Sequence, residues 1–319
     1  MLDTRPAPDE DAAAETEDNG RRFAVDLITF ADPTSWGCVD SDAFARWAAT
    51  HRAQLWAQIF ATAEATGVTG LEMTFEPFGR DSALAWLGSD TRFAQELQNR
   101  GISLVSSYLV GTERVDAYER APRRNILEQA RRLAEFTRIC GSDIIVCGLP
   151  PRRAEVVSDS DRAGAADLLG ELIETAARVG CRVALHTESH SQCWSIDDLD
   201  TILASPGLAD LWVCPDLAHL HLAGDDPAAA CARFIDRIAL VHWKDAVGTL
   251  PMRPPSDPAA HVLAQAFRPL GDGEVDLRAV RGVLARAGLL DMILIEVDAA
   301  PDPTAAIAKS IAALVPILS

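Results

Sequence analysis

The strongest constraint on the fold is a unit that repeats along the chain. Each unit is a short apolar run ending in polar residues, followed by a helical stretch rich in Ala, Leu and Arg, and often by a glycine. Strands that alternate with helices form right-handed βαβ units around a parallel sheet. Eight apolar runs are present: Arg22–Phe30, Val68–Phe75, Ile102–Leu109, Asp143–Cys147, Arg182–His186, Leu211–Pro215, Arg237–Val241 and Met292–Val297. Eight strands favour a closed barrel over an open sheet, so we predict an α/β fold, a (β/α)8 TIM barrel spanning residues 21–319.

The connections between the runs support this prediction. Ser41–Ala65, Arg124–Ile139 and Arg162–Val179 carry apolar residues at helical spacing. The connection over residues 246–275 differs, because it is long and rich in Pro and Gly. Loops of that kind are commonly lids or binding loops, so we expect it to cover the active site. Asp276 is expected to cap the helix that follows.

Composition narrows the functional class. The 319 residues include 48% apolar residues, enough for a large core, and no run approaches the roughly 18 apolar residues of a membrane span. A formal charge of −18 disfavours binding to nucleic acid or to an anionic membrane. Residues 1–20 are acidic, with little to bury, and are predicted to be a disordered tail. The seven cysteines lack C-x-x-C spacing, and the first residues lack the pattern of a secretory signal, so we expect reduced thiols and a cytoplasmic protein.

Ionisable residues follow the last four runs. Their positions are His186 and Glu188, then Asp216, His219 and His221, then His242, Lys244 and Asp245, and finally Glu296 and Asp298. The carboxyl ends of barrel strands meet at one mouth, so one residue from each strand can reach a common point. Glu188, Asp216, His242 and Glu296 would give three carboxylates and one imidazole. Such a set suits Mn²⁺, and also Mg²⁺ or Co²⁺, better than a thiolate-selecting zinc site.

Each of these residues also has a simpler interpretation. Asp216 would cap a helix, His242 would be a hydrogen-bonded core histidine, and Glu296 would be an ion-pair partner. Lys244 and Asp245 would pair with each other. We favour the metal site because the four predicted ligands follow four consecutive strands.

The second half of the chain resembles the xylose isomerase-like barrel superfamily, the sugar isomerase/epimerase group that also contains inosose dehydratase. The matching stretches are Asp216-Leu-Ala-His219, Leu222-Ala-Gly-Asp225, Arg237–Asp245, Pro269–Asp276 and Ile295-Glu296-Val-Asp298. The first half resembles the family in architecture only. The resemblance implies a divalent metal held by a strand-five acid, Asp216, His242 and Glu296. It also implies that His219 contacts a substrate hydroxyl or carbonyl and that the loop carrying Arg268 helps to close the site.

The sequence departs from the family pattern at strand five. Epimerases usually have Glu where this chain has His186, and dehydratase-like members have a second histidine where it has Glu188. The pattern His-x-Glu resembles the metal-binding subunit of the C-glycoside deglycosidases, lyases that act on 3-keto glycosides. We expect Glu188 to bind the metal and His186 to act as base, since a neutral imidazole suits that task near pH 7. The reverse assignment, with His186 as ligand and Glu188 as base, stays open.

These residues predict an enzyme that removes a proton α to the carbonyl of a keto-sugar or keto-glycoside, after which the substrate undergoes β-elimination. An isomerase or epimerase with the same metal site is the alternative. We predict two groups of site residues. The catalytic residues are His186, Glu188 and Glu296, and the substrate-binding residues are His219, Lys244, Arg268 and Tyr108. No dinucleotide or P-loop motif is present, so no nucleotide cofactor is expected.

The chain is expected to form a homo-oligomer, or a hetero-oligomer with a small β-rich subunit. In the second case the barrel would be active only with its partner chain. A related class with this fold, the DNA-repair endonucleases with three metals, is disfavoured by the acidic charge.

Overall fold

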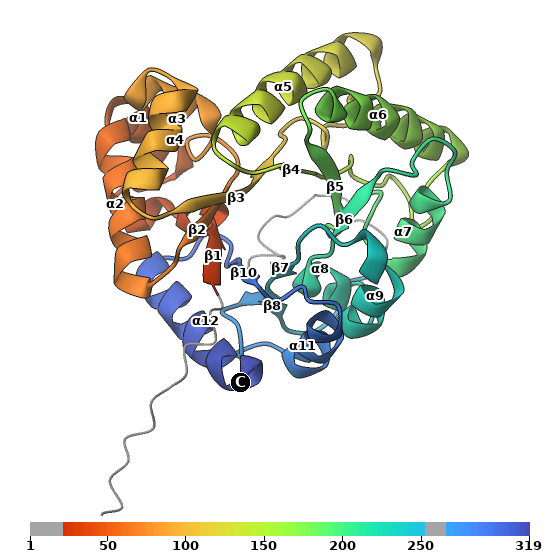
Figure 1. Cartoon of the computed structure of the whole chain (residues 1–319). Helices are drawn as coiled ribbons and strands as arrows, with labels where there is room; N and C mark the ends of the chain where they lie inside the picture. The colour runs from red at the N-terminus through yellow and green to blue at the C-terminus, as the bar shows by residue number, and fades with distance from the viewer. Residues whose placement is uncertain (1–21, 253–265) are drawn as a thin grey trace, which may run out of the picture.

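The computed structural model describes residues 22–252 and 266–319. Figure 1 shows an inner ring of strands surrounded by helices. The strands are β1 (Arg22–Asp26), β2 (Gly70–Met73), β3 (Ser103–Tyr108), β4 (Ile144–Cys147), β5 (Arg182–His186), β6 (Trp212–Cys214), β7 (His242–Trp243) and β10 (Met292–Ile295). They pair in parallel in the order β6-β5-β4-β3-β2-β1-β10-β7. Two isolated parallel bridges, Val213 to Ile238 and Asp216 to His242, join the two ends of this strand order. They close the ring, so the predicted TIM barrel is confirmed.

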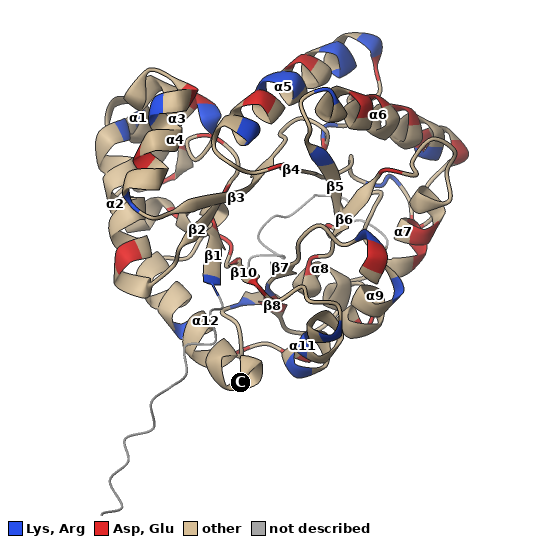
Figure 2. Ribbon diagram, viewed as in Figure 1, with Lys and Arg blue, Asp and Glu red and all other residues tan. Residues whose placement is uncertain are grey.

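The outer layer consists of helices that connect the strands. They are α1 (Ser41–Thr50), α2 (Arg52–Thr66), α3 (Arg80–Leu87), α4 (Asp90–Asn99), α5 (Arg120–Ile139), α6 (Asp159–Ala177), α7 (Ile196–Leu203), α8 (Leu217–Leu222), α9 (Pro227–Arg233), α11 (Leu277–Arg286) and α12 (Pro303–Leu318). Figure 2 shows that charged residues lie mainly on this layer, for example along α5 and α6. None of the helices in the described ranges has the length and apolarity needed to cross a membrane.

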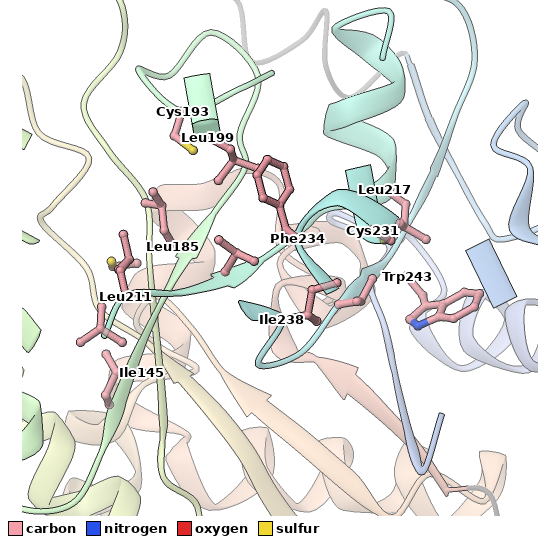
Figure 3. Close-up of a cluster of buried hydrophobic side chains, with 14 of the residues drawn as sticks. Ile145, Leu185, Cys193, Leu199, Leu211, Leu217, Cys231, Phe234, Ile238 and Trp243 are labelled. Carbon is pink, nitrogen blue, oxygen red and sulfur yellow. The ribbon is translucent and has the colours of Figure 1, made fainter. Parts of the chain in front are cut away.

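The core lies between the strands and the helices, in two large clusters. One packs β4–β7 and β10 against α5–α9, α11 and α12, and Figure 3 shows Leu185, Phe234 and Trp243 within it. The other packs β1–β3 against α1–α4 around residues such as Trp56 and Phe60. All seven cysteines fall within the described ranges and are unpaired. The apolar runs therefore form strands because their side chains pack into the core between the strands and the helices.

Three predicted elements differ in detail. The first run leaves the strand at Asp26, whose carboxylate accepts the Ile28 N–H and starts a 3-10 turn over Leu27–Phe30. The pattern over Ser41–Ala65 forms two helices, and the Thr50 hydroxyl bonds back to the preceding turn just before the break at His51.

The seventh strand begins later than predicted. The residues pairing with β10 are His242 and Trp243, whereas the predicted run Arg237–Val241 starts in a 3-10 turn, Ile235–Arg237. Pro215, which follows β6, has no N–H to donate to this neighbour, so the ladder there is reduced to single bridges.

The predicted tail, residues 1–20, lies outside the described residues, as does part of the predicted active-site loop over residues 246–275. The described ends of that loop pair through a short antiparallel ladder between β8 (Asp245–Ala246) and β9 (Phe267–Arg268). Asp276 caps α11 by accepting the Ala279 N–H, as predicted.

Asp245 anchors the far end of this loop. Its buried carboxylate accepts the backbone N–H groups of Ala246, Gly271, Gly273 and Val275 at 2.9, 2.9, 3.0 and 3.1 Å. It does not pair with Lys244, so that alternative interpretation is wrong. Successive residues of an extended chain point to opposite faces, and Lys244 points toward Glu296 instead.

Replacing Asp245 by alanine should lower the free energy of unfolding by about 3 kcal/mol or more, because the change leaves several buried N–H groups without an acceptor. Asp276→Ala removes a single exposed cap and should cost only about 1 kcal/mol. Urea unfolding of both variants checks the prediction. Equal costs for the two variants would contradict the anchoring role.

Candidate metal centre

Four side chains from four consecutive strands meet at one mouth of the barrel. His186 ends β5, Asp216 follows β6, His242 begins β7, and Glu296 follows β10. One ligand atom from each lies within 4.8 Å of the others, and all four side chains are buried. His242 Nδ1 lies 2.5 Å from Glu296 Oε2, and His186 Nε2 lies 3.6 Å from Asp216 Oδ2. We call these four residues the metal cluster.

The donor atoms of the metal cluster fit a cation. Both ring nitrogens of His186 and of His242, together with Asp216 Oδ2 and Glu296 Oε2, are buried and lack a hydrogen bond of normal geometry within the described residues. Buried polar atoms are normally satisfied, and an unpaired set of this size needs a partner. Two carboxylate oxygens and two imidazole nitrogens around one point provide the donor set of a divalent transition metal.

Asp216 caps a helix, and its geometry also suits the second role that the sequence left open, that of a metal ligand. Its Oδ1 accepts the backbone N–H of His219 at 2.8 Å and so caps α8. Its Oδ2 points into the metal cluster and has no hydrogen-bond partner in the part of the chain that the structure describes. The cap holds the side chain in the orientation in which the second oxygen faces the other ligands.

Glu188 is not a member of the metal cluster formed by the described residues, and His186 occupies the strand-five position instead. The strand ends at His186, so the alternation of side chains is not continued to Glu188. Thr187 turns its hydroxyl to the Asp216 N–H, and the Glu188 N–H donates to Cys193 O. Burial raises the pKa of Glu188, which lines the cavity beside the cluster.

The cavity next to the metal cluster has a volume of about 150 Å³. Several predicted residues line it, namely Tyr108, His186, Glu188, His219, His242, Lys244 and Glu296. An alanine side chain at position 148 would place its Cβ 2.6 Å from Tyr108 Oη and 3.2 Å from Glu188 Oε2. Gly148 therefore leaves the room in which these two polar groups face the cavity.

Lys244 forms the positive side of the cavity. Its Nζ lies 2.7 Å from Glu296 Oε1, 2.8 Å from Asp298 Oδ1 and 4.0 Å from the centre of the Phe267 ring. Burial lowers the pKa of this amine, but the nearby carboxylates of Asp298 and Glu296 outweigh burial and raise it well above the ordinary value. Lys244 is therefore a fixed cation beside one of the predicted metal ligands.

His219 is held as a neutral imidazole. Its Nδ1 accepts the backbone N–H of Ser189 at 3.0 Å, which leaves the proton on Nε2. Burial lowers the pKa of His219 to about 3, so the ring stays uncharged at neutral pH. It can donate one hydrogen bond from Nε2 toward the cavity.

Two buried carboxylates of the first half were not predicted as site residues. Glu72 lies within the second run, in β2, and its Oε1 lies 3.1 Å from His242 Nε2, while Oε2 accepts a hydrogen bond from the Ser106 hydroxyl. Asp26 lies close enough to Glu72 and His242 for the three to form a second group with metal-ligand spacing. The signal in the sequence was a single acid inside each of the first two apolar runs, and only the closed ring brings these acids to His242.

The remaining predicted residue, Arg268, lies in β9, where its Nη1 donates to Phe267 O at 2.7 Å. His190 and His221 lie at the periphery, beside Pro251 and Glu274.

The family follows from a match over most of the chain. A family model described as "Xylose isomerase-like TIM barrel" matches residues 60–317. The chain belongs to the xylose isomerase-like TIM barrel family. The resemblance seen in the second half of the sequence is thereby confirmed, and the metal cluster lies at the end of this barrel where active sites are found.

Curated relatives match this xylose isomerase-like barrel over part of its length. The rhizopine catabolism protein MocC of Rhizobium meliloti is 27% identical over 137 residues, covering 42% of each chain. An inosose dehydratase of Clostridium tetani is 26% identical over 137 residues, covering 42% of this chain and 46% of its own. The chain thus spans less than half the length of the curated relatives it matches.

Solved structures share the fold over nearly the whole barrel. A crystal structure of the IOLI protein with a binding zinc atom has a TM-score of 0.70 at 15% identity, covering 93% of this chain and 98% of that chain. The structure of an L-ribulose 3-epimerase has a TM-score of 0.67 at 14% identity, covering 93% and 94%.

Proposed function

We propose that this barrel is a divalent-metal-dependent enzyme that removes a proton α to the carbonyl of a keto-sugar or keto-glycoside, and that β-elimination follows. The observation that carries the proposal is the set of buried donor atoms, unpartnered among the described residues, beside a cavity lined by Glu188, His219 and Lys244. Perturbed titratable groups that converge on one cavity mark a catalytic site.

His186, Asp216, His242 and Glu296 are the proposed metal ligands. The assignment of His186 is the alternative that the sequence left open, and it replaces Glu188 because His186 lies in the metal cluster. Two imidazoles among four ligands favour Mn²⁺, Co²⁺ or Zn²⁺ over Mg²⁺, which prefers oxygen donors. A bound metal would polarise the carbonyl of the sugar and so acidify the adjacent C–H. Mn²⁺ remains the predicted ion, and the zinc atom bound to the IOLI protein makes Zn²⁺ the first comparison.

Glu188 is the proposed general base. It lines the cavity without belonging to the metal cluster, so it is available to accept a proton from the substrate. The Nε2–H of His219 and the Lys244 ammonium are placed to stabilise the negative charge that develops on the carbonyl oxygen. The Tyr108 hydroxyl, beside Glu188 at Gly148, can donate to the departing oxygen.

Elimination is favoured over isomerisation because the curated relatives include proteins named inosose dehydratase. Isomerisation or epimerisation with the same metal site is the second candidate, supported by the epimerase among the structural neighbours. Dependence on a small β-rich partner, oligomerisation and a cytoplasmic location remain predictions.

The proposal is tested by following hydrogen exchange and product formation by NMR in D₂O. Protein loaded with Mn²⁺, Co²⁺ or Zn²⁺ is given inososes, ketohexoses and 3-keto glycosides in turn. We expect metal-dependent deuterium incorporation next to the carbonyl, together with an unsaturated or released product from the true substrate. Incorporation with return of an isomer would select the second candidate. Absence of exchange with every metal and substrate would contradict the proposed chemistry.

A further inference from the structure

The connection that follows β5 carries a strained residue close to the proposed base. His190 has a φ of 63°, in the left-handed region that residues other than glycine rarely adopt. It lies in the β5–α7 connection, a short distance after Glu188. Strain of this kind persists only where the surrounding contacts enforce it, and it is concentrated at functional sites. The contacts that hold His190 in this conformation therefore bear on the site.

We call residues 188–193 the base turn, because this segment presents two groups of the site. Glu188 lines the cavity, and the next residue, Ser189, donates its backbone N–H to His219 Nδ1 at 3.0 Å. The turn closes on itself where the Ser191 N–H donates to Glu188 O at 3.1 Å. Its conformation therefore sets both the position of the proposed base and the tautomer of His219.

Arg152 holds the base turn from the neighbouring β4–α6 connection. Its backbone N–H donates to His190 O at 2.8 Å, and its side-chain Nε–H donates to Ser191 O at 2.8 Å. Beside these contacts, the Gln192 N–H donates to Pro150 O at 2.9 Å. Three successive residues of the base turn, the strained one included, are thus bonded to the β4–α6 connection.

The rest of the Arg152 guanidinium is fixed as well. The residue is only 3% exposed, its Nη1 donates to Glu155 O at 3.0 Å, and its Nη2 pairs with the Asp198 carboxylate. Asp198 Oδ2 also accepts the backbone N–H groups of Trp194 and Ser195 at 3.0 and 2.9 Å, at the start of α7. A guanidinium bonded through all three nitrogens is a rigid fork, which a flexible ammonium does not replace.

We propose that Arg152 is a positioning residue that holds the base turn in its strained conformation and so places Glu188 and fixes the tautomer of His219. The inference rests on the proposed function where it concerns the base, whereas the tautomer of His219 can be measured without any reaction. Arg152 is not among the described residues that line the cavity or form the metal cluster, so it acts through the turn.

The test compares Arg152→Lys with Arg182→Lys. Lysine keeps a charge beside Asp198, which preserves the fold, but its single nitrogen cannot also hold Ser191 O. Arg182 forms a comparable two-bonded pair with Asp143 at the first residue of β5, at the opposite end of that strand from the base turn.

The rate of deuterium exchange next to the carbonyl is the first measurement, made at saturating metal. Arg152→Lys should slow it by roughly 10²-fold, because a misplacement of about 1 Å has an effect of that size. The metal content should not change, since Arg152 lies outside the metal cluster of the described residues. Arg182→Lys should exchange at the rate of the wild type.

The tautomer of His219 is the second measurement, and it needs no substrate. Nitrogen NMR of the imidazole should show a bare Nδ1 and a protonated Nε2 in the wild type, because the Ser189 N–H occupies Nδ1. Arg152→Lys should give a mixture of the two tautomers, and Arg182→Lys should not. A merely structural role of Arg152 would lower the free energy of unfolding and leave the tautomer unchanged.

Relief of the strain should restore the base turn without the guanidinium. Glycine adopts a positive φ freely, so adding His190→Gly to Arg152→Lys should return the exchange rate to within about three-fold of the wild type. Ala299, with a φ of 46°, is the other non-glycine residue of positive φ among the described residues, and it lies outside the base turn. Ala299→Gly should give no recovery in the same background.

An unchanged His219 tautomer in Arg152→Lys would overturn the inference, whatever the exchange rate, as would equal recovery from Ala299→Gly and His190→Gly. A shifted tautomer with wild-type exchange would overturn the assignment of Glu188 as the base that Arg152 positions. Absence of exchange in the wild type, with a tautomer that shifts in Arg152→Lys, would refute the proposed reaction and support the hold of Arg152 on the turn.

Discussion

Metal affinity is expected to fall on the order of 10²-fold or more in Asp216→Ala and in Glu296→Ala, enough for the metal to be lost during purification. Four-ligand protein sites bind a structural zinc ion with a free energy of roughly 10–16 kcal/mol, so each ligand contributes about 3 kcal/mol. His186→Ala should behave in the same way because His186 lies in the metal cluster. Elemental analysis, together with competition against a chelator, measures the effect.

The matched control is His221→Ala. His221 lies on the same short helix as the Asp216 cap but faces Glu274 at the surface. It should retain metal like the wild type. Full occupancy in Glu296→Ala or Asp216→Ala would show that the metal cluster does not hold the ion, whereas loss in Glu188→Gln and not in His186→Ala would restore the original strand-five assignment.

Glu72 should produce a smaller effect in the same assay. Its Oε1 lies 3.1 Å from Nε2 of His242, so it can orient the ring and leave Nδ1 for the metal. Groups that orient a ligand typically contribute 10–100-fold in affinity. Glu72→Gln should fall in that range, and Glu76→Gln, the next carboxylate along the chain, should have no effect because it caps α3 instead.

Proton abstraction is expected to slow by roughly 10²–10⁴-fold in Glu188→Gln, the range that a general base contributes. The change preserves the size of the side chain and removes its ability to accept a proton. Metal content should stay that of the wild type, because Glu188 lies outside the metal cluster of the described residues. The measurement is the rate of deuterium exchange next to the carbonyl at saturating metal.

His219→Gln provides the comparison for this prediction. His219 is neutral and offers only a hydrogen bond, so its loss should reduce the exchange rate without removing the base. An exchange rate in Glu188→Gln equal to that of the wild type would assign the base elsewhere. An equal loss of exchange and of metal in that variant would mean that Glu188 acts as a ligand.

Much of the barrel could be predicted from the sequence because its signals are local. The apolar runs and the glycines after helical patterns depend on near neighbours, and the strand over Arg182–His186 was predicted to the residue. The seventh strand was misplaced because its bounds are set by pairing with β10, about 50 residues further along the chain, which no local pattern around Arg237–Val241 reveals.

For the site, the sequence by itself determined which residues follow the ends of the last four strands, and so brought Asp216, His242 and Glu296 to one mouth. Only the tertiary structure showed that His186, and not Glu188, lies within ligand spacing of the other three residues among those described, because the direction of a side chain beyond the last strand residue depends on contacts such as Thr187 with the Asp216 N–H. It also supplied Glu72 and Asp26, which are distant in sequence from His242 and meet it only when the ring of strands closes. The local pattern of apolar residues indicates where a strand ends. The residues that contact a buried charged side chain depend instead on how all the strands are arranged in the closed barrel.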